Sequence, residues 1–155
     1  MLDSTFTFPK PEKKVYDPLK KGSYPAQLTD ISEKVWKEGD DPQLSFEFRI
    51  LKEGENYGRK VWWNASKKMG LKPKKTNLCV ILEELLGRTY TQEECLSSYD
   101  EMADPMFFEL LLNKQVTLII SQAKKQDGGI KNKIEAFMPL EESLPAFDEE
   151  KVKKE

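Results

Sequence analysis

The sequence contains no histidine and only two cysteines among its 155 residues. Without histidine, the Ser-His-Asp and Cys-His nucleophilic sites and the usual zinc ligand sets are excluded. Cys79 and Cys95 are too few for a disulfide framework and too far apart for a CxxC motif. We therefore expect two reduced thiols in or near the core.

Long apolar runs are also missing. No stretch approaches the ~18 apolar residues that a membrane helix needs. The N-terminal sequence MLDSTFTFPKPEKK lacks the basic start and apolar stretch of a secretory signal. We therefore expect a cytoplasmic protein, in the host-cell cytoplasm if it is viral, with no membrane partner.

Motifs that would indicate an enzyme are absent as well. The chain has neither a Walker lysine loop nor a Rossmann glycine pattern. The adjacent acids Asp40-Asp41 and Glu83-Glu84 would point apart on a strand or helix, which makes them poor chelators. We expect no catalytic residues, no metal and no cofactor.

What the chain does have is charge, unevenly distributed. The net charge is only -2, although 34% of the residues are charged. Two basic stretches, residues 22–82 and 111–140, flank an acidic one, residues 83–110, which holds eight acids and one base. Residues 141–155 are acidic again, while residues 1–21 hold five lysines and three acids. Such blocks indicate separate surfaces of opposite sign.

Apolar periodicity predicts the secondary structure. Period-two alternation indicates a long, bent strand from residue 22, a clear strand over QLSFEFRIL and a third over RKVWWNAS. TNLCVILEELLG has a leucine-rich helical face ending at Gly87. TQEE and SYDE fit the capping-box spacing and indicate short helical turns. In DPMFFELLL, Asp104 and Pro105 are suited to start a helix that has Phe107, Leu110 and Leu111 on one face. KQVTLIISQAKK, QDGG and IKNKIEAFMPL predict a final hairpin, with Ile134, Ala136 and Met138 in phase.

This order predicts a mainly β protein. Five antiparallel strands with a helical insertion between the third and fourth are the order of the OB-fold, a five-stranded Greek-key barrel. An SH3-like barrel fits less well because it does not require the helical segment, and an α+β sandwich remains open. We expect an extended N-terminal arm over residues 1–21, the barrel domain over 22–140, and an acidic, flexible C-terminal tail over 141–155.

Several phrases resemble a known family. GSYPAQLTDI, LSFEFRILKEGENYGRKVWWNAS, LCVILEELLG and NKQVTLIISQAKKQDGGIKNKIEAFMPL are similar to the phage-type OB-fold single-stranded DNA-binding proteins. The resemblance spans roughly residues 22–140, and it implies a role in phage DNA replication or recombination. The tail, LPAFDEEKVKKE, differs from the acidic run with a terminal aromatic residue that many such proteins use to recruit partners.

The stretch YGRKVWWNASKKMGLKPKK joins two tryptophans to seven basic residues without an acid. Single-stranded nucleic acid offers phosphates to lysine and arginine and base faces to aromatic side chains. Because side chains alternate along a strand, Trp62 and Trp63 must face opposite sides. Trp63 shares a face with Val61, so we expect it to be buried, whereas Trp62 lies beside Lys60 on an outer face.

Each candidate contact has a structural alternative. Trp62 could be covered by residues 1–21, Tyr57 could only pin a turn, and Trp36 could pack in the barrel. Phe137 is either an outer-face aromatic or a contact for the helical insertion, and the lysines could be solvated surface. The predicted nucleic-acid-binding residues are Trp36, Tyr57, Arg59, Lys60, Trp62, Lys67, Lys68, Lys124, Lys125, Lys131, Lys133 and Phe137.

These observations predict a sequence-tolerant single-stranded DNA-binding protein. It would coat transient single strands, with replication or recombination proteins as further partners and possible homo-oligomer formation. An OB-fold protein-interaction or structural module that uses Trp62 in an interface is the alternative, and so is an RNA-binding protein that uses the same cleft.

Overall fold

The computed structural model describes residues 18–35, 38–39, 41–126 and 128–152. Five antiparallel strands form one sheet, and three helices lie between the third and fourth strands, so the fold is mainly β. The elements are β1 (Gly22–Lys34), β2 (Gln43–Ile50), β3 (Lys60–Ser66), α1 (Asn77–Leu86), α2 (Gln92–Met102), α3 (Pro105–Glu109), β4 (Gln115–Lys124), β5 (Ile130–Met138) and the short 3-10 helix η1 (Glu149–Lys151).

The strands bury the residues that the period-two pattern selects. On β2, Phe46, Phe48 and Ile50 are fully buried, while the residues between them face outward or lie at intermediate depth. The same side chains form one core cluster with Leu118 of β4 and with the leucine face of α1. Apolar burial of this kind, at ~25 cal/mol per Å², is the main force that holds sheet and helix together.

The strand order across the sheet is β3-β2-β1-β4-β5. Strong curvature brings the two edge strands toward each other, and the ring of Trp63 on β3 meets Phe137 on β5 edge to face at 5.0 Å. The edges do not pair with each other, so the sheet is not closed into a barrel. The expected bend in the first strand is confirmed by a register shift between Leu28 and Asp30.

A second irregularity changes which residues of the last strand, β5, point toward the core. Ile119 pairs with Ala136, but Ile120 pairs with Ile134, which leaves Glu135 as an extra residue on β5. A bulge of this kind reverses the alternation beyond it. The predicted common phase of Ile134, Ala136 and Met138 is therefore wrong: Ile134 is buried, and the other two are exposed.

Helix α1 begins and ends where the sequence indicates. The hydroxyl of Thr76 accepts a hydrogen bond from the backbone N–H of Cys79, and Gly87 ends the helix in the left-handed region at φ 66°. Both are standard caps for helix termini. Leu78, Ile81, Leu82 and Leu85 are buried as predicted, whereas Leu86 lies at the surface.

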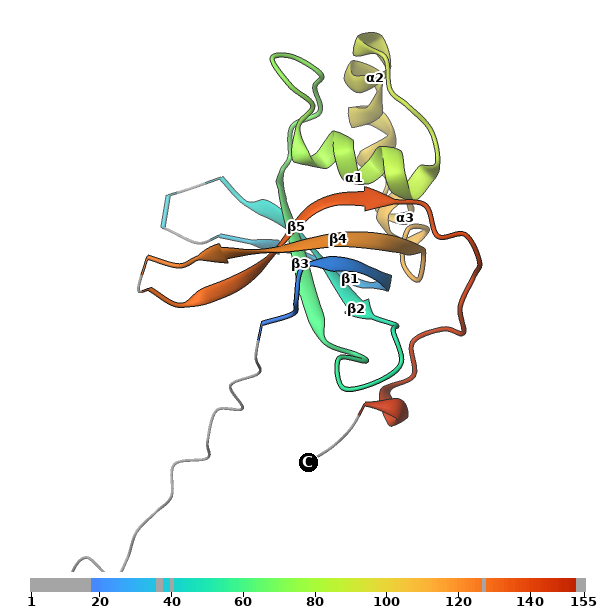
Figure 1. Ribbon diagram of the computed structural model, residues 1–155. Coiled ribbons are helices and arrows are strands. Elements are labelled where there is room, and N and C mark those ends of the chain that lie inside the picture. Colours follow the sequence, from blue (N-terminus) through green and yellow to red (C-terminus); the bar gives the residue numbers. More distant parts are fainter. Residues whose placement is uncertain (1–17, 36–37, 40, 127, 153–155) are drawn as a thin grey trace, which may run out of the picture.

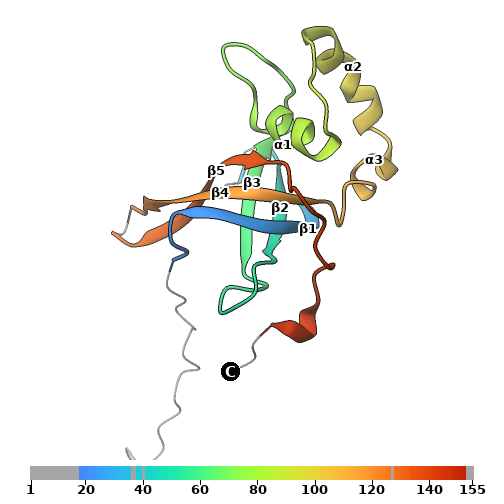
Figure 2. The same ribbon diagram turned by 45° about the vertical axis from the view of Figure 1, so that its right-hand side comes forward.

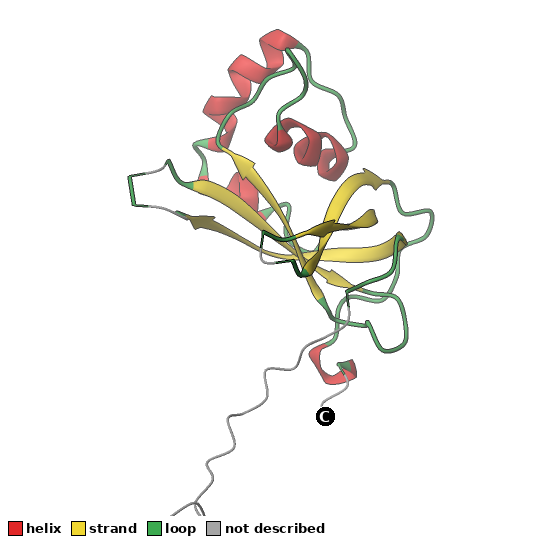
Figure 3. Cartoon of the chain, turned by 60° about the vertical axis from the view of Figure 1, so that its left-hand side comes forward, coloured by secondary structure: helices red, strands yellow, loops and turns green. Residues whose placement is uncertain are grey.

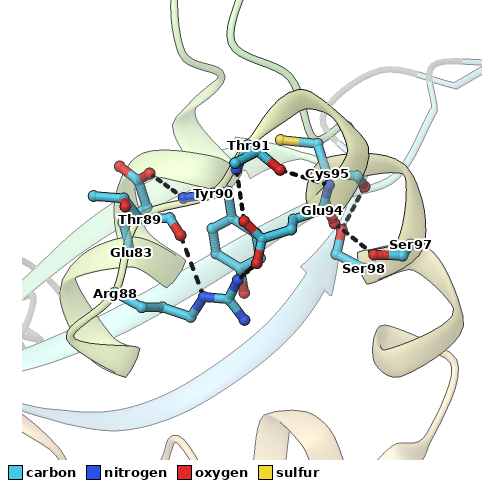
Figure 4. Close-up of polar contacts among 9 residues, drawn as sticks. All are labelled: Glu83, Arg88, Thr89, Tyr90, Thr91, Glu94, Cys95, Ser97 and Ser98. Atoms are coloured by element: carbon cyan, nitrogen blue, oxygen red, sulfur yellow. Dashed lines mark hydrogen bonds and ion pairs between the residues drawn. The ribbon is translucent and has the colours of Figure 1, made fainter.

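The connection from α1 to α2 is held by a small polar network (Figure 4). Thr91 and Glu94 form the predicted capping box, with hydrogen bonds of 3.1 and 3.2 Å. The guanidinium of Arg88 forms an ion pair with Glu94 and lies 4.3 Å from the centre of the Tyr90 ring. This network fixes the start of α2 against the end of α1.

Two predictions for the helical segment are wrong. SYDE does not start a helix, because Ser98 lies inside α2 and its hydroxyl donates to the carbonyl of Cys95 at 2.6 Å. Asp104 and Pro105 start α3 as expected, but α3 ends at Glu109. Leu110 is therefore 70% exposed, although it was expected to share a buried face with Leu111.

The described parts of both terminal segments contact the sheet. Leu19 is only 1% exposed and belongs to the core, so the described end of the arm, residues 18–21, packs with the sheet. Residues 1–17 lie outside the described residues. At the other end, the expected flexible tail is packed against the sheet through residue 152, because Phe147 supplies an aromatic contact that the acidic composition conceals.

The helices gather beyond one end of the sheet, and the C-terminal segment runs down its side to η1 at the opposite end (Figures 1 and 2). The view coloured by secondary structure shows the same separation of the helices from η1 (Figure 3). Within the described part of the chain, every helix is too short or too polar to span a membrane.

Candidate nucleic-acid interface

A groove of about 570 Å³ lies where the two edge strands approach each other. Its walls come from β3, from β5, and from the first residue of α1. Four of the lining residues are basic, two are tryptophans and none is acidic. They are Pro18, Arg59, Lys60, Val61, Trp62, Trp63, Asn64, Asn77, Ile130, Lys131, Asn132, Lys133 and Ile134.

Trp62 stands at the wall of this groove with an open face. The alternation of β3 places Val61 in the core and Trp62 outside, where it is 45% exposed as predicted. The ammonium group of Lys34 lies 5.8 Å from the centre of a Trp62 ring. Lys60, on the same face, forms an ion pair with Glu47 at 3.3 Å, so part of its charge is already compensated.

Trp63 has a different role. It is partly buried and packs on the core, and its indole nitrogen donates to the backbone carbonyl of Asn77 at 3.0 Å. The side-chain amide of Asn77 in turn donates to the carbonyl of Asn64 at 3.1 Å. Trp63 therefore fixes β3 to α1 and closes the floor of the groove, although it is less buried than we expected.

The opposite wall is built around Asn132 of β5. Its side-chain oxygen accepts from the backbone N–H of Leu19 at 2.8 Å, and its amide donates back to the carbonyl of Leu19 at 2.8 Å. Gln122 donates to the same carbonyl at 3.0 Å. These bonds hold the chain next to Pro18 against β5, and Pro18 lines the groove together with the exposed Lys131 and Lys133.

A second pocket, of about 380 Å³, continues from Trp62 along the outer face of the sheet. Arg49, Tyr57 and Arg59 line it, and the C-terminal segment forms its far wall through Val152. Tyr57 is only 8% exposed, because the ring of Phe147 stacks on it at 5.8 Å. Its hydroxyl accepts a hydrogen bond from the backbone N–H of Asp148 at 3.1 Å.

The C-terminal segment also covers Arg49. The guanidinium carbon of Arg49 lies 4.8 Å from the centre of the Phe147 ring, and a guanidinium nitrogen lies 3.7 Å from the Glu149 carboxylate. The side chains of this segment pass so close to Gly58 that a Cβ there would lie 2.6 Å from Cγ2 of Val152 and 3.1 Å from the Phe147 ring. Gly58 also has φ of +82°, so both its conformation and its surroundings require glycine.

Five of the predicted binding residues come together in the main groove: Arg59, Lys60, Trp62, Lys131 and Lys133. Lys124 ends β4, and Lys125 follows it in the hairpin turn, beyond this groove. Lys68 is exposed after β3, while Lys67 forms an ion pair with Glu33 at another surface. Trp36 lies outside the described residues.

Phe137 faces the core side of the sheet. Its ring lies 5.8 Å from that of Phe48 and 5.0 Å from that of Trp63. This position follows from the extra residue Glu135, because it reverses the alternation of side chains in the rest of β5. Of the two alternatives, the geometry is that of a packing contact near α1, since Phe137 also borders a pocket beside that helix.

Sequence reasoning missed the polar and apolar residues between the cations. Pro18, Asn64, Asn77, Ile130 and Asn132 line the groove without a charge or an aromatic ring to reveal them. Arg49 carried a usable signal: it lies on the outward face of β2 and pairs directly with Lys60 across the sheet. Like charges directly opposite each other repel, so such a pair favours acidic neighbours, which Glu149 and Glu47 supply here.

Among the described residues there is no group of three or more acidic or cysteine side chains that would hold a metal ion. The main groove offers ring faces, amides and positive charge, whereas Glu55 adds an acid to the lining of the second pocket. A scan against family models and a comparison with curated proteins each found no match for this chain.

Proposed function

We propose that this protein binds single-stranded DNA with little sequence preference. The observation that carries the proposal is the groove between β3 and β5, in which four basic side chains and two tryptophans lie together without an acid. Phosphates require the first kind of group and unpaired bases the second.

The groove suggests a division of labour. Lys131 and Lys133 on one wall and Arg59 and Lys60 on the other would follow the phosphate backbone. Trp62 would stack on a base, a contact that is worth ~1–3 kcal/mol and is available to every base. The exposed side chain of Asn64 provides hydrogen-bond groups without charge, which suits a site that tolerates different sequences.

We also propose that the sheet is an OB-fold. Three meandering strands, a helical insertion and a final hairpin are in the right chain order, and β1 lies between β2 and β4. The approach of β3 to β5 is at the position where such a barrel closes. The resemblance to phage single-stranded DNA-binding proteins then suggests a role in phage replication or recombination.

The test is a titration of the full chain with oligo-dT, blunt duplex DNA and an RNA of equal length at several salt concentrations. Oligo-dT should bind most tightly, since duplex bases hide their faces, and its affinity should fall steeply with salt as counterions compete. Equal affinity for duplex DNA would mean that the basic surface binds phosphates without any stacking on bases. Tighter binding of RNA would favour the RNA-binding alternative.

Matched lysine variants test the location. Lys133→Ala removes a groove cation, and Lys114→Ala removes an exposed lysine before β4 that does not line the groove. Lys133→Ala should weaken oligo-dT binding and reduce the salt slope by about one phosphate contact. If the two variants weaken binding equally, the proposed groove is wrong.

A further inference from the structure

The second pocket is continuous with the main groove. Arg59, Lys60 and Trp62 line both of them, so a strand that passes Trp62 on leaving the groove reaches this pocket next. Its volume of about 380 Å³ is within the ~300–1,000 Å³ that is typical of ligand sites. Its lining adds Arg49 and one exposed acid, Glu55, so the basic residues of the lining outnumber the acids by three to one.

Two lining residues of this pocket are covered by the chain itself, in an arrangement that resembles a bound nucleotide. The Phe147 ring stacks on Tyr57, with the ring centres 5.8 Å apart and the ring planes 23° apart. Two residues further along, the Glu149 carboxylate lies 3.7 Å from the Arg49 guanidinium. A flat ring on an aromatic side chain, followed by an anion on an arginine, is the pair of contacts that a base and its phosphate make.

The contacts of Arg49 leave hydrogen-bonding capacity unused. One terminal nitrogen of its guanidinium donates to the carbonyl of Gly58 at 2.8 Å, which fixes the group in place. Its buried Nε has no hydrogen-bond partner among the described residues. The 3.7 Å between the other terminal nitrogen and Glu149 also exceeds the ~2.7–2.9 Å of a charge-assisted hydrogen bond. A phosphate, with two oxygens that match the fork of a guanidinium, would use these donors better than Glu149 does.

The C-terminal segment is held most firmly before it reaches the pocket. Gln115 makes two hydrogen bonds of 2.9 Å with the backbone of Leu144, and Gln27 accepts from the backbone N–H of Phe147 at 2.9 Å. Further along, the ion pair of Lys151 joins exposed side chains at 4.0 Å, and such pairs contribute little to stability. A ligand can therefore replace the contacts inside the pocket while the two glutamines keep the segment attached to the sheet.

We propose that Tyr57 and Arg49 form a second nucleotide subsite, in which Tyr57 stacks on a base and Arg49 binds the adjoining phosphate. This inference rests on the proposed function, because the strand that enters the subsite is the one that stacks on Trp62. Phe147 and Glu149 occupy the subsite in the free protein, and a strand long enough to reach it displaces them. A short strand fills the main groove alone and leaves the C-terminal segment in place.

Photocrosslinking of the full chain tests the subsite directly. Oligo-dT in which iodouracil replaces thymine crosslinks on irradiation to the aromatic side chains that its bases stack on, and mass spectrometry of the digest identifies them. The two lengths are ~4 and ~16 nucleotides, the limits of the usual site size. We expect both lengths to crosslink to Trp62 and only the longer one to crosslink to Tyr57.

Variants separate the ring from the rest of the segment. Phe147→Ala should increase the Tyr57 crosslink and tighten binding of the longer oligo-dT on the order of fivefold, because the strand no longer has to displace a stacked ring. Binding of the shorter one should not change. Leu144→Ala is the matched control, since it removes an apolar side chain from the same segment outside the pocket. Adding Arg49→Gln to Phe147→Ala should cancel the gain, and far-UV circular dichroism checks that each variant is folded.

Two results would overturn the subsite and leave the proposed function standing. The first is a longer oligo-dT that crosslinks to Trp62 but not to Tyr57, in the wild type and in Phe147→Ala alike. The second is an equal gain in affinity from Phe147→Ala and Leu144→Ala, which would mean that loosening the segment is sufficient. Absence of oligo-dT binding at both lengths would instead refute the proposed function, and the subsite with it.

Discussion

At the scale of single residues, the two adjacent tryptophans of β3 have different surroundings. Trp62 is 45% exposed on the outer face, whereas Trp63 packs on the core and donates to Asn77. Trp62→Ala should leave the melting temperature nearly unchanged and weaken oligo-dT binding by ~1–3 kcal/mol, the value of one lost stack. Fluorescence titration and thermal unfolding of the same sample measure both quantities.

Trp63→Ala is the matched variant and should show the opposite effect. Because Trp63 is only partly buried, we expect a stability loss of about 2–3 kcal/mol, below the ~3–5 kcal/mol of a fully buried aromatic residue. Quenching of tryptophan fluorescence by oligonucleotide should persist in Trp63→Ala and largely disappear in Trp62→Ala. The reverse pattern would mean that bases stack on the other face of β3.

A single carboxylate should make the start of α2 sensitive to acid. Hydrogen bonds from the backbone and hydroxyl of Thr91, with a smaller contribution from Arg88, lower the pKa of Glu94 below its usual value. A lowered pKa in the folded state means that this stabilisation is complete above the unfolded pKa of ~4.3 and is lost as the pH falls through the folded value.

Glu94→Gln keeps the geometry of the capping box but removes the titrating charge. Between pH 5 and pH 3, the melting temperature of the variant should therefore fall less than that of the wild type. Thermal unfolding followed by circular dichroism measures both. An identical acid response in both proteins would show that other carboxylates account for the whole effect.

At the scale of elements, the C-terminal segment covers aromatic and basic groups beside the candidate site. Phe147 stacks on Tyr57, and Glu149 lies against Arg49. Removing residues 141–155 should expose the Tyr57 ring and the Arg49 guanidinium and should also remove acidic side chains beside them. Oligo-dT binding should therefore become modestly tighter at low salt. Binding titrations at low and high salt measure this change.

Point variants separate the charge from the packing. Glu149→Gln should reproduce part of the gain in affinity, whereas Glu142→Gln, which changes an exposed acid outside the Arg49 contact, should not. Truncation should also cost some stability, since the contacts of Phe147 and Val152 are lost. Weaker oligo-dT binding by a folded truncated chain would show that the segment belongs to the site instead of covering it.

The elements also show which features local sequence can predict. Strand β2 and helix α1 follow from their apolar period, and the caps at Thr76, Thr91 and Asp104 follow from the hydrogen bonds that short polar side chains make. The bulge at Glu135 was not predictable in this way, because one added residue reverses the alternation without changing the composition.

At the scale of the whole molecule, the missed features depend on contacts between distant parts of the chain. Asn132 lines the basic groove while it binds the backbone of Leu19. Phe147 packs on the sheet because its ring stacks on that of Tyr57. The tryptophan asymmetry, by contrast, needed only the alternation of one strand. The five groove residues that the sequence predicted are basic or aromatic, so their own side chains indicated nucleic-acid binding. The uncharged residues between them have no such property.

The whole molecule should also unfold as one unit, although its helices stand outside the sheet. Ile81 of α1 is fully buried in the same core cluster as Phe46, Phe48 and Leu118, and Trp63 ties β3 to the start of α1. Ile81→Ala should therefore cost ~2–5 kcal/mol and lower the stability of sheet and helices together. Val80→Ala, at a less buried position of the same helix, is the control and should cost less.

The measurement is denaturant unfolding followed by far-UV circular dichroism, which reports the helices, and by tryptophan fluorescence, which reports β3. A single core requires the two transitions to coincide in the wild type and to shift by the same amount in Ile81→Ala. An earlier circular dichroism transition, with the fluorescence transition left in place, would mean that the helical segment folds independently of the sheet. In that case α1 would not be needed to hold Trp63 at the floor of the groove, and Ile81→Ala should leave oligo-dT binding unchanged.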